Sequence, residues 1–121
     1  MNKKIYVKKV KEKKLNKWTS LVTKEVKYDK KKHIYYFIKS LDYISILAVT
    51  KNKKIPIVKQ FRPAIEKYVW EFPGGLVDKK LSLKKIAIEE IEEETGLTVE
   101  KIIKIKTSYS DIGRIINKSH F

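Results

Sequence analysis

Residues 70–97 constrain the fold of this chain more than any other stretch. An aromatic segment ends there in the turn Pro73-Gly74-Gly75. Beyond the turn, Ser82 is a suitable N-cap, and Gly96 is a suitable residue to end a helix in the left-handed conformation. Apolar residues recur between them at helical spacing, namely Leu83, Ile86, Ala87 and Ile91. The stretch therefore predicts a strand, a tight turn and one helix with a single apolar stripe.

The same helix carries a dense cluster of carboxylates. Five of the six residues from Glu89 to Glu94 are Glu, in a chain whose net charge is +15. On a helix, Glu90, Glu93 and Glu94 share one face, where like charges repel. Oxygen ligands of this kind suit Mg²⁺ or Mn²⁺. The run alone is more typical of a solvated acidic face than of a metal site, so the metal site depends on the sequence context of the run.

Strands are predicted on both sides of this helix. β-branched and aromatic residues favour strands over residues 18–26, 34–38, 43–50, 55–61, 68–72, 97–106 and 120–121. Residues 5–10 are either a short strand or a mobile tail, and residues 109–117 are predicted as a loop. Trp70 and Phe72 are predicted to belong to the core rather than to a site. The fold class is α+β.

The spacing from Gly75 to Leu97 resembles the Nudix box. That pattern is Gly, five residues, Glu, seven residues, Arg-Glu, an aliphatic residue, any residue, Glu-Glu, any residue, Gly and an aliphatic residue. The matching positions here are Gly75, Glu90, Ile91, Glu93, Glu94, Gly96 and Leu97. The resemblance implies a Nudix-like α/β/α sandwich with a mixed sheet and one loop-helix-loop motif. It also implies that Glu90, Glu93, Glu94 and the backbone carbonyl of Gly74 bind the metal, and that the three Glu are catalytic.

Two positions depart from the pattern. Leu81 stands where the first Glu is expected, and Glu89 stands where Arg is expected. In the family that Arg pairs with and orients the neighbouring Glu. Glu89 replaces this attraction with repulsion beside Glu90, and Leu81 cannot bind a metal. The box therefore predicts metal binding more strongly than it predicts catalysis.

The segments before the box resemble the ADP-ribose pyrophosphatase branch of the family. Residues 57–63 match a Gln-aromatic-Arg-Pro stretch, and residues 71–75 match a Glu-Leu-Pro-Ala-Gly stretch. The resemblance implies that Arg62 contacts phosphate, which its planar guanidinium suits. It gives Glu71 either a role near substrate and metal or, equally well, the place of a solvent-facing strand residue.

Three further substrate contacts are predicted outside these segments and the box. In this branch, aromatic residues of the N-terminal hairpin stack on adenine, which assigns Trp18 and Tyr36 to the substrate, with core packing as the alternative for at least one of them. Arg114 lies in a segment that resembles a Gly-Arg-aliphatic-x-Asn loop and is assigned to substrate recognition.

The predicted domains are an N-terminal basic segment and β-hairpin over 1–38, serving as a dimerisation arm, and a Nudix domain over 39–121.

The composition excludes some kinds of site and makes other classes of protein less favoured. The chain lacks Cys, which excludes disulfides and thiolate metal sites. It also lacks an apolar run long enough for a membrane span, so we expect a soluble, cytoplasmic protein. The cations are almost all Lys, and only Arg62 and Arg114 are Arg. Scattered Lys favours a solvated surface over a nucleic-acid footprint, so RNA is the second choice of partner.

These observations predict an Mg²⁺-dependent hydrolase of the pyrophosphate bond in a nucleoside diphosphate linked to another moiety. ADP-ribose is the expected substrate, and the expected assembly is a homodimer. The alternative is a catalytically impaired Nudix-fold module that binds RNA or a ribonucleoprotein. Family members continue beyond the point that matches Phe121, with further strands, a helix and a loop carrying another Glu, so we expect the domain to be incomplete at its C-terminus.

Overall fold

The structure is a computed structural model that describes residues 4–121. Residues 1–3, which include Lys3 of the predicted basic segment, lie outside the described residues. The chain divides into two compact units. Unit 1 consists of residues up to Leu41 together with Tyr109–Lys118, and unit 2 consists of Asp42–Ser108 together with Ser119–Phe121.

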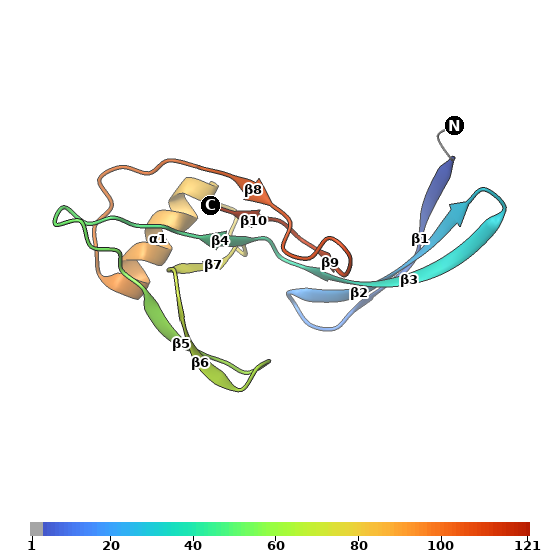
Figure 1. The fold of residues 1–121 in the computed structure, drawn as a ribbon, viewed down its shortest axis with the longest axis horizontal. Helices are drawn as coiled ribbons and strands as arrows, with labels where there is room; N and C mark the ends of the chain where they lie inside the picture. Colours follow the sequence, from blue (N-terminus) through green and yellow to red (C-terminus); the bar gives the residue numbers. More distant parts are fainter. Residues whose placement is uncertain (1–3) are drawn as a thin grey trace. The chain divides into compact units, whose positions relative to one another are not determined.

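Unit 1 is built on a sheet with the order β1-β2-β3-β9 (Figure 1). Its strands are β1 (Ile5–Lys14), β2 (Thr19–Tyr28), β3 (Lys31–Ser40) and β9 (Ile115–Ile116). The first three pair antiparallel and β9 pairs parallel with β3, so the sheet is mixed. The N-terminal segment is thus a strand rather than a tail. The predicted loop over residues 109–117 is correct except for the two residues of β9.

The sheet of unit 1 has a small covered area. Val22 and Val26 of β2 are its buried apolar residues. The antiparallel register places Val22 opposite Phe37 on one face, so Tyr36 lies on the other face. Tyr36 is 67% exposed, and Ile34 on the same face is 50% exposed. Apolar side chains therefore lie uncovered within this unit.

Unit 2 contains a second mixed sheet with the order β7-β4-β10-β8. Its strands are β4 (Tyr43–Ser45), β7 (Gly74–Leu76), β8 (Thr107–Ser108) and β10 (Ser119–His120). β4 pairs antiparallel with β7 and parallel with β10. A separate hairpin joins β5 (Val58–Arg62) to β6 (Lys67–Glu71), with Arg62 opposite Lys67 at the turn.

The helix α1 (Leu83–Thr95) follows β7 and confirms the prediction from the sequence. The Ser82 side chain accepts a hydrogen bond from the Lys85 backbone N–H, which caps the first turn. Gly96 ends the helix with φ 69°, and its N–H donates to the Glu92 carbonyl. Ile86, Ala87 and Ile91 are buried, and the first two pack with Ile44 of β4. This packing fixes the helix against the sheet, with its carboxylates on another side.

Two predictions about the strands need correction. The strand predicted over residues 43–50 is limited to Tyr43–Ser45, and none forms over 97–106. In that segment Ile102 packs against the core, whereas Ile103 and Ile105 are exposed. β-branched residues favour a strand only where a neighbouring strand offers backbone partners. Here that pairing begins at residues 105 and 106, whose backbone N–H groups donate to the carbonyl of Phe121.

His120 belongs to the structural framework of unit 2. It is 9% exposed in β10. Its Nε2 lies 2.9 Å from Oδ2 of Asp42, and its Nδ1 lies 3.1 Å from Oγ1 of Thr107. Both ring nitrogens therefore have partners, and the side chain holds β10 between β8 and the start of β4.

Candidate active site

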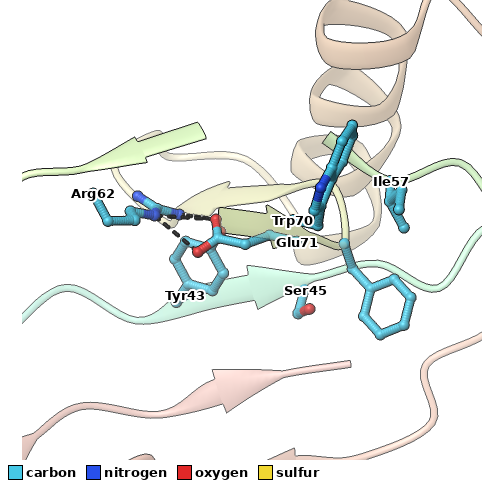
Figure 2. A pocket seen from close by; sticks show the side chains of 7 residues that line it. Tyr43, Ser45, Ile57, Arg62, Trp70 and Glu71 are labelled. Carbon is cyan, nitrogen blue, oxygen red and sulfur yellow. Dashed lines mark hydrogen bonds and ion pairs between the residues drawn. The ribbon is translucent and has the colours of Figure 1, made fainter. Parts of the chain in front are cut away.

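A pocket of about 440 Å³ opens in unit 2 beside the β5–β6 hairpin (Figure 2). Aromatic and aliphatic side chains form much of its wall. The residues that line it are Tyr43, Ser45, Ile57, Arg62, Trp70, Glu71 and Phe72. Its volume falls in the range of small-molecule sites, and it combines apolar walls with a few polar groups.

Arg62 and Glu71 form the polar centre of this pocket (Figure 2). The Arg62 Nε donates to both carboxylate oxygens of Glu71, at 2.9 and 3.0 Å, and its Nη2 donates to Oε2. The guanidinium hydrogen bond lowers the pKa of Glu71, and the same bond raises the pKa of Arg62. The pair is charged at neutral pH, and the carboxylate fixes the orientation of the guanidinium.

Tyr43 lines the pocket beside the pair (Figure 2). Burial raises the pKa of its hydroxyl, and the hydrogen bond with Arg62 opposes that increase. The tyrosine is therefore a neutral hydrogen-bonding group beside a cation. From the sequence, Tyr43 was expected in a strand and had no assigned role, since no motif indicated that it would contact Arg62 of the hairpin.

Trp70 and Phe72 were predicted to be core residues, and this prediction is wrong. Trp70 is 64% exposed and Phe72 is 45% exposed, and both line the pocket. Within the described residues β5 and β6 pair only with each other, so no third strand lies beside Trp70. An aromatic side chain on such a hairpin is available to a ligand.

Glu94 connects the pocket hairpin to the acidic helix. Its Oε1 accepts a hydrogen bond from Nε2 of Gln60 at 3.2 Å, and its Oε2 accepts one from the Gly74 N–H at 3.0 Å. One carboxylate thus links β5, β7 and α1. Gln60 lies in the motif that resembles the ADP-ribose pyrophosphatases, but the motif alone did not reveal that it contacts the helix.

Glu90 packs directly against Gly75. A Cβ on Gly75 would meet the Glu90 carboxylate, with Oε2 at 2.6 Å, so the absence of a side chain at Gly75 makes room for it. Burial raises the pKa of Glu90, and the charges of Glu94 and Glu93 raise it further. A bound cation would relieve this repulsion. The oxygen ligands and the crowded negative charge therefore fit a divalent metal.

The carboxylates are close but do not yet form a complete metal centre. Among residues 4–121, no three acidic or His side chains already stand together as a metal-binding cluster. Glu94 is held by Gln60 and Gly74, and Glu93 points its Oε1 to within 4.0 Å of the Lys79 ammonium. Joint binding of a cation would require the side chains of Glu93 and Glu94 to move toward that of Glu90.

The remaining predicted residues belong to unit 1. The Trp18 side chain is 41% exposed, and the Lys17 ammonium lies 4.2 Å from its ring centroid. Tyr36 projects from β3, and Arg114 pairs with Asp111 at 2.8 Å. Their assignment to the substrate stays a prediction, since these residues lie in a different unit from the pocket.

A comparison with protein-family models identifies the family of the chain. The model of the NUDIX domain matches residues 39–116. The chain belongs to the Nudix family. The prediction made from residues 75–97 is thereby confirmed.

The relatives confirm the branch that the flanking motifs predicted. The chain is 41% identical over 70 residues to the ADP-ribose pyrophosphatase of Bacillus subtilis, covering 58% of this chain and 38% of that protein. It is 36% identical over 110 residues to an uncharacterized Nudix hydrolase of Schizosaccharomyces pombe, covering 80% of this chain and 53% of that protein. The chain thus spans about half or less of the length of these relatives.

The fold is confirmed by a solved structure. A crystal structure of an ADP compounds hydrolase matches with a TM-score of 0.78 and 16% identity, covering 99% of this chain and 65% of that one. At this identity the likeness concerns the Nudix fold alone.

Within residues 4–121, none of the helices has the length and the apolar character that a membrane span requires.

Proposed function

We propose that this Nudix chain is part of an Mg²⁺-dependent hydrolase of the pyrophosphate bond in a nucleoside diphosphate linked to another moiety, with ADP-ribose as substrate. The contact that carries the proposal is the link from Gln60 through Glu94 to Gly74. It joins the hairpin that presents Arg62 to the helix that presents Glu90. A cationic phosphate contact and an acidic metal helix thus belong to one connected unit.

Arg62 would bind the phosphates. Glu71 engages its Nε and Nη2, and Tyr43 also hydrogen-bonds the guanidinium, so part of its five N–H groups remains to donate to a phosphate oxygen. The ion pair keeps the guanidinium in one orientation before substrate arrives, which reduces the entropy lost on binding. Tyr43 can donate its neutral hydroxyl beside it. Glu71 is therefore assigned to orienting Arg62 rather than to direct contact with substrate.

The carboxylates of α1 would hold Mg²⁺ or Mn²⁺ together with the Gly74 carbonyl. When bound, the metal supplies positive charge to the phosphoryl oxygens and acidifies a coordinated water. Glu90 is one candidate to accept a proton from that water, because its carboxylate lies against Gly75 on the helix face that it shares with Glu93 and Glu94. A carboxylate outside this chain is the other candidate for the base.

The similarity to the ADP-ribose pyrophosphatase of Bacillus subtilis supports the choice of substrate. The pocket supports it physically, because Trp70 and Phe72 line it together with Arg62 and add apolar surface to its wall. An aromatic base and a diphosphate require these two kinds of contact together.

Arg62→Lys should lower kcat/KM for ADP-ribose about tenfold, mainly by raising KM, because Lys loses the planar fork that Glu71 orients. Steady-state rates with Mg²⁺ would measure the change. Lys67→Ala is a matched control, since Lys67 pairs with Arg62 across the hairpin but does not line the pocket. Equal effects of the two substitutions would contradict the role given to Arg62.

For unit 1 we propose the dimerisation arm expected of residues 1–38. The apolar side chains left uncovered on its sheet, Ile34 and Tyr36 among them, are suited to burial against a second copy. Sedimentation of the chain tests this assignment, and a monomer at all concentrations would overturn it.

A second candidate function rests on the distribution of charge. Residues 4–41 and 109–118 hold fifteen Lys or Arg against four Asp or Glu, whereas unit 2 is nearly balanced. Unit 1 would therefore attract RNA, with the Nudix fold serving as a binding module. Salt-dependent retention on RNA without any ADP-ribose turnover would favour this alternative.

A further inference from the structure

One ion pair connects the loop before α1 to the acidic helix. The Lys79 ammonium lies 2.6 Å from Oε2 of Glu89 and 4.0 Å from Oε1 of Glu93. Glu89 and Glu93 are four residues apart, so they are neighbours on the helix surface. A single ammonium therefore touches two successive turns of α1. Both members of the closer pair are partly exposed, at 44% and 40%.

This ion pair gives a structural context to the two residues that depart from the Nudix pattern. Position 89 should be Arg and position 81 should be Glu, but the chain has Glu89 and Leu81. From the sequence alone, Glu89 adds only repulsion beside Glu90. In the structure the loop supplies a compensating cation from Lys79, two residues before Leu81. The extra carboxylate at position 89 is thus paired with a cation from the loop.

Lys79 is also the cation that balances the cluster. Burial raises the pKa of Glu90 and the charges of Glu94 and Glu93 raise it further, whereas the Lys79 charge lowers it. In the described part of the chain, both ion pairs that reach carboxylates of α1 come from Lys79. Without it, Glu89 and Glu93 would face each other as uncompensated charges one turn apart.

We propose that Lys79 is a positioning residue for the metal-binding carboxylates, acting through Glu89 in place of the missing Arg of the box. The proposal rests on the function proposed above. Lys79 holds the β7–α1 loop against the helix and neutralises the extra carboxylate at position 89. It pairs most closely with Glu89, so Glu93, at 4.0 Å, stays available to turn toward Glu90 and a bound cation.

The change in Mn²⁺ affinity caused by Lys79→Glu shows whether Lys79 positions the carboxylates or acts only through its charge. Lys79→Glu makes the site more negative, so a cation that acted only through its field would, when removed, allow Mn²⁺ to bind more tightly. If Lys79 positions the helix carboxylates, Lys79→Glu instead repels Glu89 and Glu93 and weakens binding. The two accounts predict opposite signs for the same measurement.

The test is Mn²⁺ affinity of the full chain, measured by electron paramagnetic resonance of free Mn²⁺. We expect Lys79→Glu and Glu89→Arg each to bind about three- to fivefold more weakly than wild type. The double variant restores an ion pair with the signs expected of the box, and should return to within about twofold of wild type. Lys79→Arg keeps the cation and should bind normally.

Lys80→Glu is the matched control, because it makes the same charge change one residue away. It should bind Mn²⁺ no more weakly than wild type. Tighter binding by Lys79→Glu, or equal losses from Lys79→Glu and Lys80→Glu, would overturn the role of Lys79 while leaving the metal site in place. Failure of the wild-type chain to bind Mn²⁺ would overturn the metal site itself, and the role of Lys79 with it.

Discussion

Gly74→Ala should destabilise the chain by about 3 kcal/mol or more. A Cβ at Gly74 would collide with the carbonyl oxygen of Ile44 and approach Cα of Ser45 to 3.2 Å. These are backbone atoms of the paired strand β4, where Ser45 lies opposite Gly74. A backbone cannot swing aside as a side chain can, so β7 must separate from β4.

The loss would extend to the candidate site. Gly74 donates its N–H to Glu94, so separation of β7 also releases the link between α1 and the pocket hairpin. Urea unfolding should show a lower midpoint for Gly74→Ala. Gly113→Ala is the control, because the nearest atom to its Cβ, Oδ1 of Asp111, is 3.6 Å away. Its change should stay within about 0.5 kcal/mol, and equal losses at the two positions would contradict this account.

Glu90→Gln should have the largest effect on catalysis, with kcat for ADP-ribose falling about 10²- to 10³-fold. The substitution removes a charged metal ligand and a candidate base while keeping the shape of the side chain against Gly75. Glu92→Gln is the matched control. It neutralises an exposed carboxylate of the same helix that lies outside the proposed ligand set.

The same substitution should stabilise the metal-free chain at neutral pH. Because burial and the neighbouring carboxylates raise the pKa of Glu90, the folded state keeps this proton to a higher pH than the unfolded chain does. Ionised Glu90 therefore opposes folding. The penalty is absent below the unfolded pKa and complete above the folded pKa.

Thermal unfolding measures this sign directly. In chelator, Glu90→Gln should melt above wild type at pH 7 and at the same temperature as wild type below the unfolded pKa. Saturating Mg²⁺ should reverse the order at pH 7, since only wild type keeps the full set of ligands. A variant that melts below wild type in chelator at pH 7 would show that ionised Glu90 stabilises the fold.

The helix was predictable because its signals are local. Ser82, Gly96 and the apolar spacing between them specify where α1 begins, ends and packs, and the structure confirms all three. The strand predicted over 97–106 failed for the opposite reason. A strand depends on a partner, and residues that alternate correctly remain irregular where none is available.

The candidate site was predicted in its motifs but not in its contacts. Arg62 and Glu71 were singled out separately, but their direct ion pair depends on the register that places β5 beside β6. Tyr43 and Lys79 were missed because each reaches its partner across a distance in sequence that carries no periodic signal. Lys79 in particular looks like any other Lys in this basic chain until its loop is folded against Glu89.

The most direct test of the proposed function is hydrolysis of ADP-ribose by the 121-residue chain in Mg²⁺, compared with Glu93→Gln. Cleavage of the pyrophosphate should release AMP and ribose 5-phosphate, which phosphorus NMR distinguishes from the substrate. We predict metal-dependent turnover by wild type and a loss of about 10²-fold or more in Glu93→Gln. Equal rates in the two proteins would contradict the assignment of the α1 carboxylates to catalysis.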